Sequence, residues 1–256
     1  MSSIDNQQLY RAWIGKRDAD RVPIVMMHEG LGSVSQWLGS GFPQTLHEAS
    51  GRAVFLYDRR GYGRSVPRNE PWATDFLTTE ALDWLPRVLD SEGIDAALFY
   101  GHSDGATISL EFAASNPGRA LRVVAEAPHT VVEERTLQGI RDLRTRFSQD
   151  GRLRDELSRY HGAGADALFA GWSGMWLHPG FSGCDIRAAL ECLEVPVMVI
   201  QGGEDPYGSD THMRTIAVLS RAPVAQVWLA DTGHAPHRQC DAWLDRVIRF
   251  LSNEER

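Results

Sequence analysis

Short apolar runs separated by longer mixed segments dominate the pattern of the chain. Most of the runs are continuous rather than alternating, as expected for strands that are buried on both faces of a parallel sheet. We expect six such strands, at residues 23–27, 53–57, 96–100, 122–127, 195–200 and 225–230. The stretch LYRAWIGK, at residues 9–16, is a candidate for an additional antiparallel strand at the start.

Helical patterns lie between several of these runs. Residues 74–93 carry apolar side chains near helical spacing. A second helix is expected from Asp104, which supplies an acidic first turn, to the Asn-Pro-Gly stop at 116–118, and a third at 238–252. Alternating strands and helices predict an α/β fold, in which helices cover both faces of a mostly parallel sheet.

Residues 128–190 interrupt this alternation, because they contain helical patterns and no convincing strand. Three sets of apolar residues are spaced for three helix faces. The sets are Leu137, Ile140, Leu143 and Phe147; Leu153, Leu157 and Tyr160; and Leu168, Trp172 and Trp176. A single crossover needs only one helix, so we predict a helical cap at 128–190, inserted into a core formed by 1–127 and 191–256.

Composition narrows the function classes. The chain has 256 residues, enough for one α/β domain with an insertion. A net charge of −8 without a dense basic cluster argues against nucleic acid and anionic membranes as partners. The start, MSSIDNQQLYRAW, lacks a signal-peptide pattern, and no run approaches the roughly 18 apolar residues of a membrane span. Three widely spaced cysteines indicate neither a disulfide framework nor a zinc site, so we expect a reducing, cytoplasmic compartment.

The segment YGHSDGAT, at residues 100–107, carries the clearest chemical signal. Its core fits G-x-S-x-G around Ser103, between an expected strand and an expected helix, which is the context of a nucleophile elbow. His102 and Asp104 cannot complete a Ser-His-Asp triad with Ser103, because neighbouring side chains on one backbone point apart. The partners of Ser103 must therefore come from elsewhere in the chain.

Four other polar segments directly follow apolar runs. They are MMHEGLGSVSQW (26–37), DRRGYGRS (58–65), IQGGEDPYG (200–208) and ADTGHAPH (230–237). Because the carboxyl ends of parallel strands share one edge, where ligands bind, we expect these segments to meet near Ser103. The resulting chain order is serine, acid, histidine.

In these motifs the sequence resembles the α/β-hydrolase superfamily, and specifically its capped, carboxylesterase-like serine hydrolases. HEGLGS resembles the family's H-G-x-G-S, DRRGYGRS its D-x-R-G-x-G-x-S, and GHSDG its elbow. GGED resembles its G-x-x-D acid loop, and the Gly-His pair at 233–234 its final G-H. The resemblance covers about residues 20–252 and implies the fold more specifically than the substrate.

The resemblance implies a role for each member of a triad. Ser103 is the expected nucleophile, and His234 is the expected general base and then general acid. Asp205, the last residue of GGED, is expected to orient His234. Its neighbour Glu204 is the alternative acid.

The expected oxyanion hole uses the backbone N–H groups of Asp104, which follows the nucleophile, and of Gly30, by resemblance. Glu29 stands where the family usually has glycine. A carboxylate facing the site would oppose the negative charge of the tetrahedral intermediate. We therefore predict that it points away and pairs with an arginine of DRRGYGR, which offers Arg59, Arg60 and Arg64.

Large apolar side chains are expected to line a substrate pocket, although each is also suited to the cap's own core. They are Trp37, Phe169, Trp172, Met175, Trp176 and Tyr207. His102 is expected to be structural or to form the floor of the site, and His237 to be a wall or helix-start residue. No metal is expected, because no H-E-x-x-H motif occurs and no clustered ligands are evident. The glycines match neither a Rossmann nor a P-loop pattern, so no cofactor is expected either.

These patterns together predict a cofactor-independent serine hydrolase that forms an acyl-enzyme on Ser103 and cleaves a small carboxylic ester, thioester or lactone. Hydrolysis of a carbon–carbon bond in a diketone-type substrate by the same triad is the alternative. Other classes are a non-catalytic ligand-binding protein and a cofactor-free oxygenase or lyase. The expected partner is a small molecule, and a homodimer is left open.

Overall fold

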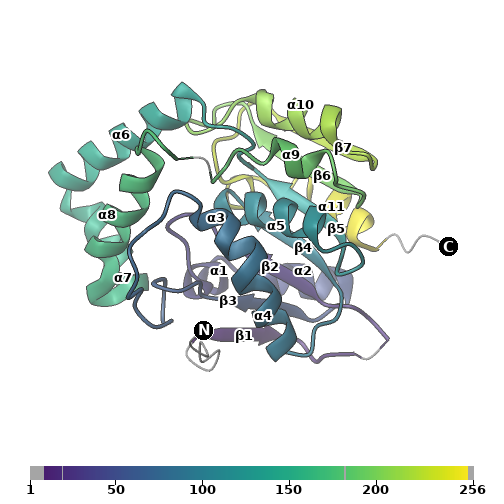
Figure 1. The fold of residues 1–256 in the computed structure, drawn as a ribbon. Helices are drawn as coiled ribbons and strands as arrows, with labels where there is room; N and C mark the ends of the chain where they lie inside the picture. Colours follow the sequence, from purple (N-terminus) through teal and green to yellow (C-terminus); the bar gives the residue numbers. More distant parts are fainter. Residues whose placement is uncertain (1–8, 19, 182, 253–256) are drawn as a thin grey trace.

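The structure is a computed structural model that describes residues 9–18, 20–181 and 183–252. Within these residues, seven strands form one sheet in the order β1-β3-β2-β4-β5-β6-β7 (Figure 1). β1 runs antiparallel to β3, and every other neighbouring pair is parallel. The strands are β1 (Arg11–Ile14), β2 (Ile24–Met27), β3 (Val54–Tyr57), β4 (Ala97–His102), β5 (Ala120–Glu126), β6 (Val197–Gly202) and β7 (Val224–Leu229).

The six expected strands and the additional antiparallel strand are confirmed to within a few residues. Every residue of β2, β3, β4 and β6 is buried, which explains their continuous apolar runs. Successive residues of a strand enter opposite layers: Phe99 packs in one hydrophobic cluster, while Leu98 and Tyr100 pack in the other. β7 lies at the edge of the sheet, and its Trp228 is exposed.

Helices cover both faces of the sheet, as predicted. The cluster on one face includes side chains of α3, α4, α5 and α10, and the cluster on the other includes those of α1, α2 and α11. The helices of these layers are α1 (Val34–Ser40), α2 (Phe42–Ser50), α3 (Phe76–Thr79), the π-helical η2 (Glu80–Trp84), α4 (Leu85–Ser91), α5 (Asp104–Ser115), α9 (Arg187–Leu190), α10 (Asp210–Leu219), the 3₁₀ turn η4 (Pro236–Arg238) and α11 (Leu244–Ser252).

The described part of the segment between β5 and β6 contains helices joined by turns and irregular stretches, and no strand. It contains α6 (Glu134–Gln149), α7 (Gly151–His161), the 3₁₀ turn η3 (Gly162–Gly164) and α8 (Ala165–Trp176). Figure 1 shows α6, α7 and α8 together at one side of the sheet. Phe147 of α6 stacks on Phe169 of α8 with ring centroids 3.8 Å apart. We propose that these helices form the cap, whereas α9, in the same segment, packs against α5 and α10.

Two further expectations from the sequence concern membrane spans and disulfide bonds. No helix in the described ranges is both long and apolar enough to span a bilayer. Cys184, Cys192 and Cys240 are free. Residues 1–8, which form most of the starting segment that was compared with signal peptides, lie outside the described residues.

Candidate active site

Ser103 occupies a strained turn between β4 and α5. Its φ is 54° and its ψ is −120°, a conformation that costs a non-glycine residue about 1–3 kcal/mol. The neighbouring backbone holds the turn, because Ser103 N–H donates to the Glu126 carbonyl at 2.9 Å and the Ser103 carbonyl accepts from Ala106 N–H at 2.9 Å. A side chain on Gly105 would overlap the Met27 carbonyl, so this turn requires glycine there. The sharp turn places Ser103 at its tip, where the residue lines a cavity but is only 5% exposed.

Asp205 and His234 meet at the same edge of the sheet, from the loops after β6 and β7. His234 Nδ1 donates to Asp205 Oδ2 at 2.8 Å. Gln201 Nε2 and the Tyr207 N–H also donate to this carboxylate, each at 2.8 Å. Burial would raise the pKa of Asp205, but the charge and hydrogen bond of His234 hold this pKa well below its usual value. Glu204 is exposed, so the structure places Asp205 behind His234.

A small cavity of about 110 Å³ brings the expected site residues together. Ser103 and His234 both line it, as do Gly30 and Asp104. The remaining lining residues are Glu29, Leu31, His129, Thr136, Ile140, Leu143, Trp172, Trp176 and Tyr207. The cavity therefore lies between the carboxyl edge of the sheet and helices α6 and α8.

Three of the six expected pocket residues, Trp172, Trp176 and Tyr207, line the cavity, and the other three do not. Trp37 is fully buried beneath the site, where its ring stacks on His237 at 4.3 Å. The Phe169 ring is turned toward α6. Met175 is partly buried against the main hydrophobic cluster. Trp172 and Trp176 are four residues apart and share the inner face of α8. This spacing explains why these two residues of α8 line the cavity while Phe169 and Met175 do not.

Trp172 contacts both expected oxyanion donors. Its Nε1 donates to Asp104 Oδ2 at 3.0 Å. A side chain on Gly30 would overlap the same indole, so glycine is required where the cap approaches this loop. Burial raises the pKa of Asp104, and the charge of Arg59 and the Trp172 hydrogen bond offset part of this rise.

Glu29 lines the cavity with Ser103, and its carboxylate pairs with an arginine other than those predicted. Arg238 Nη2 donates to Glu29 Oε1 at 2.9 Å, and His102 Nδ1 lies 3.6 Å from Oε2. Arg59 instead donates to the Glu29 backbone carbonyl at 2.8 Å, and the other two arginines of that segment bond elsewhere. Burial would raise the pKa of Glu29, but His102 and Arg238 hold it well below its usual value.

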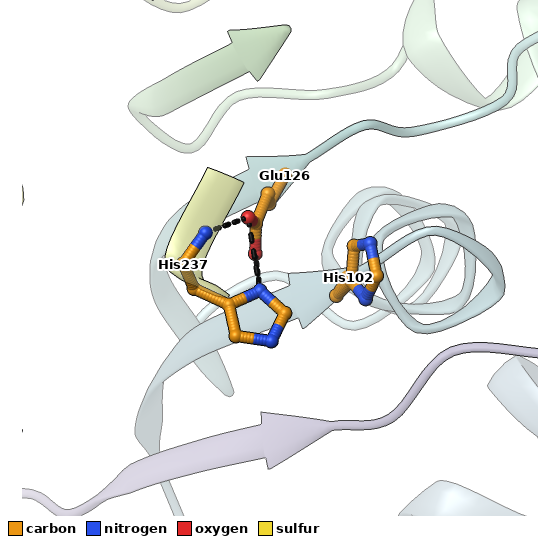
Figure 2. A group of neighbouring side chains, drawn as sticks. All are labelled: His102, Glu126 and His237. Atoms are coloured by element: carbon orange, nitrogen blue, oxygen red, sulfur yellow. Dashed lines mark hydrogen bonds and ion pairs between the residues drawn. The ribbon is translucent and has the colours of Figure 1, made fainter. Parts of the chain in front are cut away.

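His102, Glu126 and His237 form a buried cluster (Figure 2) next to the loop that carries His234. Glu126, at the end of β5, accepts from His237 Nδ1 at 2.9 Å, from His237 N–H at 2.7 Å and from the Tyr100 hydroxyl at 2.7 Å. His102 Nε2 lies 2.8 Å from the His234 carbonyl, which can only accept, so His102 donates. The cluster therefore holds the backbone of the loop that carries His234 through this hydrogen bond.

Opposite charges in this cluster stabilise each other's ionised forms and shift their pKa values. Burial would lower the pKa of His102, but Glu126 and Glu29 raise it to about 9. Burial would raise the pKa of Glu126, but His237 and His102 lower it to about 2. Among the described residues, His102, Glu126 and His237 are spaced closely enough for a metal ion, which the sequence did not suggest. His237 and Glu126 bond to each other, and His102 Nε2 donates to the His234 carbonyl, while His102 Nδ1 has no hydrogen-bond partner. We describe the three residues as a buried polar cluster.

Glu126 and His129 are site residues that the sequence analysis missed. Both lie at the carboxyl end of a buried strand, β5, and that position is the signal that points to them. The His129 ring centroid is 6.0 Å from that of His234. Burial, together with the charges of His212 and His234, keeps the pKa of His129 well below its usual value. A neutral imidazole therefore forms part of the cavity wall.

Comparison with known proteins identifies relatives in sequence and in fold. Among curated proteins, a proline iminopeptidase of Neisseria gonorrhoeae is 30% identical over 119 residues, which are 46% of this chain and 35% of that protein. The chain thus spans about a third of the length of the curated relatives it matches. Two solved structures share the fold. The enol-lactonase of Burkholderia xenovorans LB400 has a TM-score of 0.70 at 21% identity, covering 96% of each chain. A carboxylesterase of Bacillus subtilis has a TM-score of 0.68 at 19% identity, covering 96% of this chain and 88% of that one.

The family model described as "Alpha/beta hydrolase family" matches residues 24–249, a range that includes all seven sheet strands except β1 and every expected site residue. With the mostly parallel sheet, the strained serine turn and the sequence motifs in the family's order, the chain belongs to the alpha/beta hydrolase family.

Proposed function

We propose that the protein is a cofactor-independent serine hydrolase that cleaves small carboxylic esters, including thioesters or lactones, through an acyl-enzyme on Ser103. The observation that carries this proposal is the His234–Asp205 hydrogen bond of 2.8 Å, with His234 lining the same cavity as Ser103. A serine on a strained turn and a histidine oriented by a buried carboxylate are the parts that acyl transfer requires.

In the acylation step, Ser103 Oγ attacks the ester carbonyl carbon, and His234 Nε2 takes the hydroxyl proton. The Asp205 carboxylate stabilises the imidazolium that forms. Negative charge develops on the carbonyl oxygen, which accepts hydrogen bonds from the N–H groups of Gly30 and Asp104. When the intermediate collapses, the bond to the leaving oxygen breaks, and that oxygen takes the proton from His234.

In the deacylation step, a water molecule gives its proton to His234 and attacks the acyl carbon. The second tetrahedral intermediate collapses, the bond to Ser103 Oγ breaks, and His234 returns the proton to the serine. The acid product leaves and the protein is unchanged. No electron transfer or further reactant enters this scheme, so hydrolysis balances with substrate and water alone.

The Burkholderia neighbour is an enol-lactonase and the Bacillus neighbour a carboxylesterase, which supports ester chemistry at this fold without naming the substrate here. The small cavity supports a short acyl group. The alpha/beta hydrolase fold hosts several reactions, so the bond that is cleaved has to be tested directly.

A panel of p-nitrophenyl esters of increasing acyl length tests the proposal. We expect turnover that is highest for short chains, and a loss of about 10⁴-fold or more in kcat for Ser103→Ala with the fold intact. Activity of Ser103→Ala within tenfold of the parent would remove the nucleophile role. A folded protein that hydrolyses no ester but cleaves a diketone would favour carbon–carbon hydrolysis, and one that cleaves neither would favour a binding protein or a cofactor-free oxygenase or lyase.

A further inference from the structure

The cavity contains buried polar atoms that no protein group satisfies. Asp104 Oδ2 is bonded by Trp172, but Asp104 Oδ1 has no hydrogen-bond partner. The Nε1 of Trp176 and the Nδ1 of His129 also have none. All three residues are at most 7% exposed, and all line the cavity beside Ser103.

Unpaired buried polar atoms are uncommon in native proteins, because each costs about 1–3 kcal/mol. Three of them on one cavity wall are therefore expected to have a partner in the bound state. The three are also neighbours. The Trp176 indole N–H faces the Asp104 carboxyl closely enough to act as a weak donor that lowers its pKa, but the two groups do not meet the geometry of a hydrogen bond. The rings of His129 and Trp176 are 4.9 Å apart.

The chemistry of these atoms selects the group that fits them. Trp176 Nε1 can only donate a hydrogen bond, and Asp104 Oδ1 accepts one when the carboxyl is ionised. A hydroxyl does both at once, so it can donate to Asp104 Oδ1 and accept from Trp176 Nε1. An ammonium can only donate and would leave the indole N–H unpaired, while a methyl group would leave both atoms unpaired.

The position of Asp104 locates this group on the substrate. The proposed reaction places the carbonyl oxygen on the Asp104 backbone N–H, so the side chain of the same residue lies close to the reacting carbon. The wall also contains the apolar side chains of Ile140 and Leu143 and the ring of Trp172. A short acyl chain with one polar substituent near the carbonyl matches this arrangement.

We propose that the cavity recognises a hydroxyl group beside the reacting carbonyl through Asp104 and Trp176, which makes short 2-hydroxyacyl esters the preferred substrate class. This inference rests on the proposed ester hydrolysis. Asp104 and Trp176 are the specificity-determining side chains, and His129 Nδ1 is available to a second polar atom of the acyl group.

Three phenyl esters test the proposal, because they share a leaving group and differ at one position. They are the esters of 2-hydroxypropanoic acid, of 2-methylpropanoic acid and of alanine, which present a hydroxyl, a methyl and an ammonium group. Each kcat/KM is divided by the rate of hydroxide-catalysed hydrolysis of the same ester, so that intrinsic reactivity cancels. We expect the hydroxyl ester to exceed the methyl ester by about tenfold, the effect of one hydrogen bond to a charged group.

Two variants remove the recognition in different ways. In Asp104→Asn the amide oxygen still accepts from Trp172, but an NH₂ replaces the accepting Oδ1. Trp176→Phe removes the N–H and keeps an aromatic ring. Both should reduce the hydroxyl-to-methyl ratio to about one, since the specific hydrogen bond is lost. Leu143→Ala, an apolar wall position, is the matched control and should keep the ratio of the parent.

The outcomes distinguish a failure of hydroxyl recognition from a failure of the proposed ester hydrolysis. An unchanged ratio in Asp104→Asn and Trp176→Phe, or faster corrected turnover of the alanine ester, would overturn hydroxyl recognition while leaving ester hydrolysis intact. No turnover of any ester by the folded protein would overturn the proposed function. In that case, titration of Ser103→Ala with the hydroxyl and methyl esters, followed by tryptophan fluorescence, decides the recognition. Tighter binding of the hydroxyl ester supports it, and equal binding overturns it.

Discussion

Two adjacent carboxylates in the loop after β6 differ sharply in their surroundings. Asp205 is 1% exposed and holds His234 Nδ1, whereas Glu204 is exposed. We expect Asp205→Asn to lower kcat by about 10³–10⁴-fold, because an amide no longer stabilises the imidazolium and favours the wrong tautomer. Glu204→Gln, the matched control, should remain close to the parent. Steady-state kinetics on one short ester measure both, and a larger loss in Glu204→Gln would move the role to that residue.

Glu29 is a second residue whose neighbours determine the effect of a substitution. Its carboxylate is ionised over the working pH range, because His102 and Arg238 keep its pKa well below the usual value. We expect Glu29→Gln to shift the loop that carries Gly30 and so to lower kcat, without changing the acidic limb of the rate profile. Glu70→Gln, at a surface carboxylate paired with Arg60, is the control. A severalfold increase in rate for Glu29→Gln would show instead that its charge opposes the reaction.

Sequence motifs could predict the site residues that directly follow strands. They could not predict hydrogen-bond or packing partners that come from distant segments of the chain. Ser103, Asp205 and His234 each follow a strand of the parallel part of the sheet, and the structure places all three at one edge. The partner of Glu29 is Arg238, 209 positions away, in a 3₁₀ turn whose path the sequence pattern does not specify. The orientation of Phe169 depends on Phe147 of another helix, which spacing within α8 cannot reveal.

At the scale of elements, the ends of β4 and β5 and the turn η4 are joined by the buried cluster of His102, Glu126 and His237. The pKa of His102 is raised from 6.5 to about 9 in the folded protein. Its contribution to stability is therefore complete below about pH 6.5 and is lost as the pH rises through about 9.

This linkage gives a prediction for His102→Gln. We expect the variant to be less stable than the parent at pH 6, and the difference in free energy of unfolding to shrink as the pH approaches 9. Urea denaturation of both proteins at several pH values measures it. His47→Gln, at a histidine on α2 bonded to a backbone carbonyl, controls for the loss of an imidazole. A stability difference that is constant from pH 6 to pH 9 would mean that His102 is not a buried cation.

The inner faces of α6 and α8 determine the size of the proposed acyl pocket. Ile140 of α6 is 1% exposed and lines the cavity. We expect Ile140→Ala to enlarge the cavity and move the preferred acyl length to longer chains, at a stability cost of about 2–5 kcal/mol. Val218→Ala, at an exposed apolar side chain of α10, should leave the chain-length preference unchanged. An unaltered preference in Ile140→Ala would place the acyl group elsewhere.

The elements differ in how clearly the sequence predicts them, for a physical reason. Strands buried on both faces have continuous apolar runs, so β2, β3, β4 and β6 could be located from this pattern. The short helices α1 and α2 were not predicted, because seven and nine residues hold too few turns for a clear periodicity. The expected helix at 74–93 is divided by the π-helical turn η2, a local feature that apolar spacing does not indicate.

At the scale of the whole molecule, a mostly parallel sheet gathers the loops after β2, β4, β5, β6 and β7 around one small cavity. The fold class followed from the alternation of elements, and the comparisons confirm it. The substrate did not follow, since it depends on side chains from the helices between β5 and β6 that meet the sheet edge only in three dimensions. The pairing of Trp172 with Asp104 is one such contact.

The most direct test of the central proposal is covalent labelling with a phosphonate that carries a p-nitrophenyl leaving group. Attack by Ser103 Oγ forms an oxygen–phosphorus bond, and p-nitrophenolate leaves. We expect release of one equivalent of p-nitrophenolate per chain, a phosphonate adduct located on Ser103 by mass spectrometry of the digested protein, and no adduct in folded Ser103→Ala. An adduct on another residue, or an unlabelled Ser103 in the folded parent, would contradict the proposal that this serine is the nucleophile.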